Sequence, residues 1–309
     1  MKFLGAFLIF FIVGFCFLSC TQKQEKEKVI PNQEAVSNSF FVVPKIPNSM
    51  ELCGETIDLT DIDVRDRLDR EILSNAYFHS STMLYLKRAN RFFPEIEKML
   101  KENNIPDDIK YLSVIESGLS HAVSPAGAKG FWQFMPQTAK EYGLNVNDQI
   151  DERLQIAKST MAACKYLQDA KDSLQDWFLA IASYNRGVGG VRSDLKWQES
   201  SDYFDSYMNN ETGRYIFRLM AIKLIMENPK DYGYDLSKME LYEPYKTKTI
   251  TVFGGIKDIS KWAIEKGVNY KIVKILNPWI LNNSLPANKS FDILLPTENM
   301  NLKPRRAYN

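Results

Sequence analysis

Apolar residues at helical spacing run from about residue 62 to residue 236, and this run limits the fold more than any other feature. Strand-like alternation of apolar and polar residues is missing from it. One helix of this run is expected to start at Phe93-Pro94. Another begins at Pro106-Asp107-Asp108, where an aspartate can cap the first turn, and ends at Gly118. The pattern predicts about eight helices, and so an all-α domain over residues 62–238.

A different pattern follows residue 240. Residues 247–252 alternate polar and β-branched side chains, and residues 291–296 form a second strand-like run. Two short helical patterns lie between them. The order strand, helix, helix, strand predicts a small α+β module over residues 245–298. Residues 41–60 contain Pro44 and Pro47 and predict an irregular chain.

The first twenty residues are typical of a processed leader. Lys2 precedes an apolar run that ends at Ser19-Cys20, after which the chain becomes strongly polar. This resembles the lipobox of bacterial lipoproteins, although Phe17 stands where leucine is usual. We expect a signal peptide over 1–20, lipidation of Cys20 and a tether over 21–61. A lipid anchor then places the chain in the cell envelope, at the outer membrane facing the periplasm. An ordinary secretory signal or an uncleaved anchor is the alternative.

Composition excludes several classes of function. A formal net charge of +1 argues against a nucleic-acid partner. Two histidines and four cysteines without a CxxC pair argue against a metal site, and no motif indicates a cofactor. Once the leader is removed, Cys53 and Cys164 remain, and we expect two separate buried thiols rather than a disulfide.

The segment from Glu116 to Pro136 carries the strongest chemical signal. Glu116 lies at the apolar end of a helix, where burial raises a carboxyl pKa and suits a general acid. The loop after it combines glycines with hydroxyl groups, the amide of Gln133 and aromatic residues. We expect the aromatics to stack on a sugar; they are Phe131, Trp132 and Phe134. The alternatives are a glutamate facing water and aromatics packed in the core.

Two further clusters lie at helix ends. Residues 182–187 read ASYNRG and residues 211–215 read ETGRY. Taken alone, each is better explained as a helix cap.

Together the three stretches resemble the lytic transglycosylase family (glycoside hydrolase family 23, goose-lysozyme-like), in its membrane-bound branch. The resemblance covers roughly residues 62–235 and implies a lysozyme-like fold and cleavage of the β-1,4 bond between N-acetylmuramic acid and N-acetylglucosamine. It implies Glu116 as the catalytic residue. The substrate-binding residues that it implies are Ser117, Ser124, Gln133, Met135, Tyr184, Asn185 and Tyr215. The chain departs from the family pattern at Phe131, Trp132 and Arg186.

The C-terminal module resembles a degenerate LysM fold, which implies binding of peptidoglycan glycan strands; a structural cap on the catalytic domain is the alternative. Glycosidases generally use two carboxylates. Here Asp148 and Asp151 are the other candidates, and helix capping explains them better. We therefore expect Glu116 to act as acid and then base, forming 1,6-anhydromuramic acid ends. A hydrolytic muramidase and a non-catalytic peptidoglycan-binding lipoprotein are the rival functions.

Overall fold

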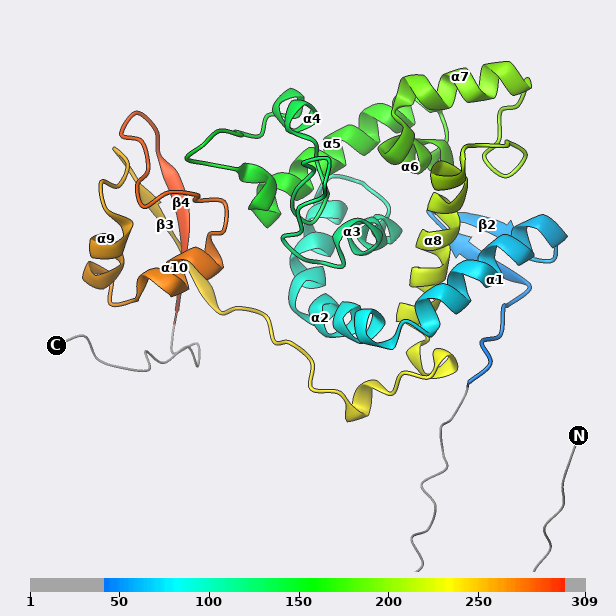
Figure 1. Ribbon diagram of the computed structural model, residues 1–309, viewed down its shortest axis with the longest axis horizontal. Coiled ribbons are helices and arrows are strands. Elements are labelled where there is room, and N and C mark those ends of the chain that lie inside the picture. Colours follow the sequence, from blue (N-terminus) through cyan, green and yellow to red (C-terminus); the bar gives the residue numbers. More distant parts are fainter. Residues whose placement is uncertain (1–41, 298–309) are drawn as a thin grey trace, which may run out of the picture. The chain divides into compact units, whose positions relative to one another are not determined.

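The computed structural model describes residues 42–297, which form ten α-helices and four β-strands (Figure 1). The expected signal peptide with Cys20, and the tether up to residue 41, lie outside the described residues. Eight helices, α1 to α8, lie between Ile62 and Glu227, as the helical spacing predicted. Among residues 42–297, no helix is both long and apolar enough to cross a membrane. The fold is mainly α.

The segment before α1 forms a β-hairpin, so the prediction of an irregular chain was wrong. β1 (Ser49–Leu52) pairs antiparallel with β2 (Glu55–Asp58). Leu52 and Leu59 are fully buried in the main core. At the turn, Cys53 N donates to Asp108 Oδ2 at 2.7 Å. Strands of this length are too short to show a clear alternation in the sequence.

The first two helices are α1 (Ile62–Ala76) and α2 (His79–Glu102). Asp61 caps α1 by accepting a hydrogen bond from Val64 N at 3.0 Å. Pro94 was expected to start a new helix, but it lies inside α2. A proline lacks the N–H that would bond one turn back. The helix continues because buried residues on both sides, including Leu86 and Ile96, hold it against the core.

The helix α8 (Asn210–Glu227) runs through the protein interior, and eleven of its residues are buried. It contacts α1, α3 (Lys110–Ser117) and α6 (Trp177–Arg186). A helix that is apolar on nearly all sides belongs in a protein interior. α8 lies beside α3 (Figure 1), and its Tyr215 reaches Glu116 near the end of α3.

The remaining elements of the helical part connect these. They are α4 (Pro136–Glu141), α5 (Ile156–Leu174) and α7 (Val188–Gln198), with 3-10 turns at Asp107–Ile109, Glu152–Leu154, Pro229–Tyr232 and Leu236–Lys238.

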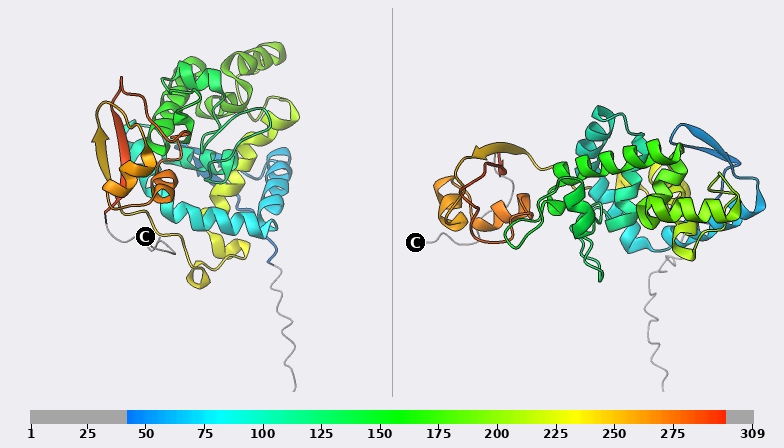
Figure 2. Two further views of the ribbon diagram at one scale, coloured as in Figure 1. Left: turned by 60° about the vertical axis from the view of Figure 1, so that its left-hand side comes forward. Right: turned by 90° about the horizontal axis from the view of Figure 1, so that it is seen from above.

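The C-terminal module has the predicted order of strand, helix, helix and strand. Its elements are β3 (Thr247–Val252), α9 (Ile259–Glu265), α10 (Tyr270–Leu276) and β4 (Phe291–Pro296). β3 and β4 pair antiparallel with Ile250 opposite Ile293. The buried face of β4 packs with the helices in a second, separate core. Figure 2 shows the strands and helices of this module together. The domain bounds expected from the sequence stay predictions.

One segment of the helical part joins the core of this module. Ile150 is buried among module residues and forms a β-bridge with Ile280. On either side, Asp151 N donates to Trp279 O and Leu281 N donates to Gln149 O, both at 2.9 Å. Backbone hydrogen bonds therefore link residues 149–151 to the module.

The hairpin makes a testable contribution to stability. Leu52→Ala removes a side chain that is 0% exposed, so we expect a loss of about 2–5 kcal/mol in the free energy of unfolding. Glu55→Ala, on the exposed side of the same hairpin, should change it by no more than about 0.5 kcal/mol. Denaturant unfolding of both variants measures the difference. Equal effects would show that the hairpin does not belong to the core.

Candidate active site

Glu116 lies in the last turn of α3, which ends at Gly118 in the left-handed conformation (φ 60°). A side chain on Gly118 would overlap the ring of Tyr85, so glycine serves both the turn and the packing. The carbonyl groups at this helix end receive hydrogen bonds from two arginines. Arg218 donates to Ile115 O at 2.9 Å, and Arg88 donates to Gly118 O at 2.8 Å. These cations offset the negative end of the helix, which otherwise opposes a carboxylate there.

Tyr215 of α8 holds the carboxyl group of Glu116. Its hydroxyl donates a short hydrogen bond to Glu116 Oε1, and the tyrosine is almost fully buried. In the described part of the chain, no group donates a hydrogen bond to Glu116 Oε2. The carboxyl is thus fixed through one oxygen, while the other remains available to a substrate.

Burial raises the pKa of Glu116 above its ordinary value. The hydrogen bond from Tyr215 and the charge of Arg218 oppose this shift, and the charge of Glu211 reinforces it. Burial, and then the charge of Glu116, raise the pKa of Tyr184 and Tyr215 well above their ordinary range, so both hydroxyls stay protonated. Burial therefore shifts the carboxyl of Glu116 toward its protonated form, and Tyr215 and Arg218 act in the opposite direction.

The loop from Ser124 to Phe134 lies beside this carboxyl. Ser117 Oγ donates to Phe131 O at 2.9 Å, and Tyr184 Oη donates to Trp132 O at 2.8 Å. Gln133 follows with a positive φ of 46°, and its amide nitrogen donates to carbonyl groups within the loop. Residues next to Glu116 thereby fix the loop backbone just before Gln133.

The aromatic residues of the loop do not form a sugar-stacking surface, so that expectation was wrong. Phe131, Trp132 and Phe134 are between 0% and 4% exposed and belong to the main core. Trp132 Nε1 donates to Thr160 Oγ1 of α5 at 2.9 Å. The burial of these three side chains in the core stabilises the loop, and their rings do not face a ligand.

Of the other predicted residues, Asn185 and Ser124 form hydrogen bonds within the protein, whereas Met135 is exposed. Asn185, at the end of α6, accepts a hydrogen bond from Thr212 Oγ1 at 2.7 Å and so ties α6 to the first turn of α8. Ser124 accepts from Ala128 N at 3.0 Å and closes its own turn. Met135 is 42% exposed at the start of α4, and no contact described here brings it to Glu116.

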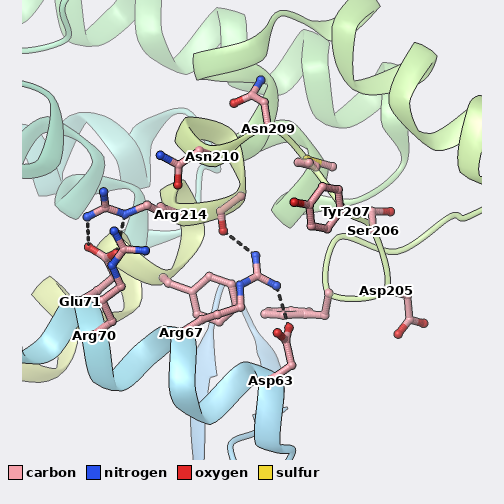
Figure 3. Close-up of a pocket in the computed structure, with 14 residues that line it drawn as sticks. Asp63, Arg67, Arg70, Glu71, Asp205, Ser206, Tyr207, Asn209, Asn210 and Arg214 are labelled. Carbon is pink, nitrogen blue, oxygen red and sulfur yellow. Dashed lines mark hydrogen bonds and ion pairs between the residues drawn. The ribbon is translucent and has the colours of Figure 1, made fainter.

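Ion pairs that the sequence did not predict hold the first turns of α8 against α1. Arg214 pairs with Glu71, whose side chain is 2% exposed, at 2.7 Å and 3.1 Å. Arg67 donates to Gly213 O at 2.5 Å and lies over the ring of Phe217. Figure 3 shows these side chains facing one another between the two helices. They fix the turn of α8 that carries Tyr215.

Sequence reasoning also missed Glu211 and Arg218, the two other charges that act on Glu116. Both lie on α8 at helical spacing from Tyr215, so the spacing rule could have placed all three on one face. Thr160 and Glu71 had no such signal, because each meets its partner only through the tertiary fold.

Neither predicted second carboxylate is placed for catalysis. Asp148 is exposed in a turn. Asp151 is buried and caps the 3-10 turn Glu152–Leu154 through a hydrogen bond from Arg153 N, and not the helix α5 that was expected to be capped. Although burial favours its neutral form, bonds from Arg153 and Lys129 lower the pKa of Asp151 below its ordinary value.

Among residues 42–297, no group of three or more histidine, cysteine, aspartate or glutamate side chains is arranged to hold a metal ion. Cys53 and Cys164 are free thiols. Burial raises the pKa of Cys164 to about 11, so this thiol is not an activated nucleophile.

Two family models match the chain. The transglycosylase SLT domain matches residues 93–206, which include Glu116, Gln133 and Tyr184 but not Tyr215. The soluble lytic transglycosylase C-terminal LysM-like domain matches residues 248–299.

Three curated relatives are similar to the chain, and two of them are named as lytic murein transglycosylases. Membrane-bound lytic murein transglycosylase D of Escherichia coli (strain K12) is 27% identical over 239 residues, which cover 75% of this chain and 51% of that protein. The putative tributyltin chloride resistance protein of Alteromonas sp. (strain M-1) is 29% identical, over 38% of this chain and 58% of its own length. Membrane-bound lytic murein transglycosylase F of Shewanella frigidimarina is 28% identical, over 42% of this chain and 30% of its own.

The match to the first of these relatives spans about half of its length. The first family match lies within the helical part, and the second covers the C-terminal module. The chain therefore contains a transglycosylase SLT domain followed by a LysM-like domain, and it is homologous to membrane-bound lytic murein transglycosylase D.

Proposed function

We propose that this chain is a peptidoglycan lytic transglycosylase with Glu116 as its catalytic residue. The observation that carries the proposal is the state of that carboxyl within an SLT domain. Its pKa is raised, one of its oxygens is held by Tyr215, and the other has no protein donor in the described part of the chain. A general acid needs this combination of proton affinity and access.

In the proposed reaction, protonated Glu116 donates its proton to the glycosidic oxygen between N-acetylmuramic acid and N-acetylglucosamine, and the bond from that oxygen to the muramyl C1 breaks. The muramyl N-acetyl group stabilises the developing cation. Ionised Glu116 then takes the proton of the C6 hydroxyl, whose oxygen bonds to C1 and closes the 1,6-anhydro ring. The proton balance of Glu116 is restored, and no water is consumed.

The surroundings of Glu116 suit both steps. Burial favours the protonated acid, whereas Tyr215 and Arg218 favour the carboxylate that must persist until the ring closes. One group can act as acid and then base only if both of its protonation states are accessible, and these opposing effects act on that balance.

We assign the remaining predicted residues by their geometry. Ser117, Ser124 and Tyr184 use their hydroxyls within the protein, so they position the loop rather than bind sugar. Gln133 uses its amide nitrogen within the loop, whereas no group in residues 42–297 donates to its amide oxygen, and that oxygen is our proposed substrate contact. Met135 is exposed and stays a predicted contact.

The LysM-like module is proposed to bind glycan strands beside the catalytic domain. Lipidation of Cys20 and a place at the outer membrane facing the periplasm also remain proposals; they are supported by the leader sequence and by two relatives that are named as membrane-bound.

A hydrolytic muramidase is the second candidate, and Glu211 is the observation that favours it. This carboxylate lies in the first turn of α8, where the helix dipole favours its charge, and close enough to raise the pKa of Glu116. It could activate a water molecule as a second carboxylate does in hydrolytic glycosidases.

Glu116→Gln removes the proton donor with little change in shape, so we expect glycan cleavage to fall about a thousandfold or more. Release of soluble muropeptides from purified sacculi measures it, and thermal unfolding should show an intact fold. The control Asp148→Asn removes an exposed carboxylate and should retain wild-type activity. Cleavage by Glu116→Gln at the wild-type rate would falsify the assignment.

The chemistry of the products separates the two enzymes. We expect released muropeptides to end in anhydromuramic acid, which has the mass of the hydrolytic product less one water. Mass spectrometry of the digest decides this. Products that carry the extra water, and that disappear in Glu211→Gln, would replace the transglycosylase with a hydrolase.

Two substitutions should move the pH profile in opposite directions. The first step needs protonated Glu116, so kcat/KM falls as pH rises through its pKa. Tyr215→Phe removes a hydrogen bond that lowers this pKa and should shift the alkaline limb to higher pH. Glu211→Gln removes a charge that raises it and should shift the limb to lower pH. Shifts of the same sign in both variants would contradict the proposed acid.

A further inference from the structure

A buried ion cluster of Lys129, Asp151 and Arg153 contacts the loop from Ser124 to Phe134. Arg153 and Asp151 are 3% and 1% exposed. Arg153 Nε and Nη2 each donate to a carboxylate oxygen of Asp151 at 2.8 Å, and Lys129 Nζ lies 3.2 Å from the same carboxylate. Neither the proposed reaction nor helix formation requires a buried guanidinium here.

Arg153 contacts the loop in three ways. Its Nη1 donates to Gly127 O at 2.8 Å and to Phe134 O at 3.0 Å, so one nitrogen joins an early and a late residue of the loop. The carbonyl of Arg153 lies so close to Gly130 that any side chain there would overlap it. The backbone of the loop is thus shaped around this one residue.

Other residues of the loop are bonded to the proposed site. Phe131 O and Trp132 O accept from Ser117 and Tyr184, the neighbours of Glu116. Gln133 adopts its positive φ between these bonds and the one from Arg153 to Phe134 O. A positive φ at a residue other than glycine persists only where the surroundings hold it.

The cluster is itself fixed from outside. Asp151 N donates to Trp279 O, and Gln149 O accepts from Leu281 N, so the LysM-like module bonds the chain on which Asp151 lies. Contacts therefore run without a break from the module through Asp151 and Arg153 to the loop.

A buried ion pair adds little net stability compared with an apolar pair, because both charges lose their hydration. Arg153 makes four side-chain hydrogen bonds, which compensate this loss and set one geometry. The cluster is therefore better suited to specify a conformation than to raise the free energy of unfolding.

We propose that Arg153 and Asp151 are positioning residues that hold Gln133 in its substrate-binding conformation, and that the LysM-like module braces them. The proposal rests on the transglycosylase function proposed above. It assigns the module a role in the catalytic domain that is separate from any binding of glycan.

The first test compares Arg153→Met with Arg153→Lys in the full chain. Losing the loop bonds should lower kcat on purified glycan strands on the order of a hundredfold. Arg153→Lys keeps the charge and part of the bonding, so it should recover part of this loss. Hydrogen exchange of the amides of residues 124–134 should quicken in Arg153→Met.

Lys223→Met is the matched control. Lys223 is also a mostly buried cation paired with two carboxylates, Asp108 and Glu227, but it contacts neither the loop nor Glu116. It should lower the melting temperature yet leave kcat and loop exchange unchanged. An equal fall in kcat in Lys223→Met, or wild-type kcat in Arg153→Met, overturns the positioning role.

The second test addresses the module. Leu281→Pro removes the N–H that donates to Gln149 O, at a residue whose side chain is 37% exposed. Loop exchange should quicken and kcat should fall. Ala287→Pro, at an exposed turn of the same module, should do neither. Equal behaviour of the two variants overturns the bracing.

The exchange measurements do not depend on catalysis. A wild-type chain without cleavage activity would refute the proposed function, whereas unchanged loop exchange in Arg153→Met would refute the positioning of the loop alone.

Discussion

The main constraint on the structure is that the half-buried carboxyl of Glu116 lies at the negative end of a short helix, α3. The backbone of α3 cannot supply hydrogen-bond donors there, because the last turn of a helix has free carbonyl acceptors and no free N–H donors. The donors come from elsewhere: Arg88 of α2, and Tyr215 and Arg218 of α8. α8 can supply them only by running through the interior, and this explains why it is apolar on nearly all sides.

The parts of the fold that follow from local pattern were predictable. The helix ending at Gly118 depends on a cap and a left-handed turn within a few residues, and the structure confirms it. The order of elements in the C-terminal module also follows from local sequence patterns, and the structure confirms it. Pro94 and the β1–β2 hairpin were mispredicted because tertiary packing overrode a local signal. In one case buried neighbours continue a helix through proline, and in the other two short strands are stabilised by the core beneath them.

The candidate site shows the same division. The position of Glu116 and its nearness to a loop could be inferred from one continuous stretch of sequence. Whether Trp132 faced a sugar or the core could not, since the deciding partner, Thr160, lies on another helix. The pair of Glu71 with Arg214 joins residues 143 positions apart, and no periodicity predicts such a contact. Charges on one helix are the intermediate case, because Glu211 and Arg218 follow from the spacing around Tyr215.

The way the N-terminal segment is fastened has a mechanical consequence. Side chains from outside this segment donate hydrogen bonds to the extended chain that leads into β1. Tyr77 donates to Val42 O at 2.8 Å, Arg65 donates to Ile46 O at 3.2 Å, and Tyr232 donates to Lys45 O at 3.4 Å. Tension applied from the N-terminal direction would meet these bonds before it reached the hairpin and the core. The hydrogen bonds of this segment would take up such tension, so that it would not distort the geometry around Glu116.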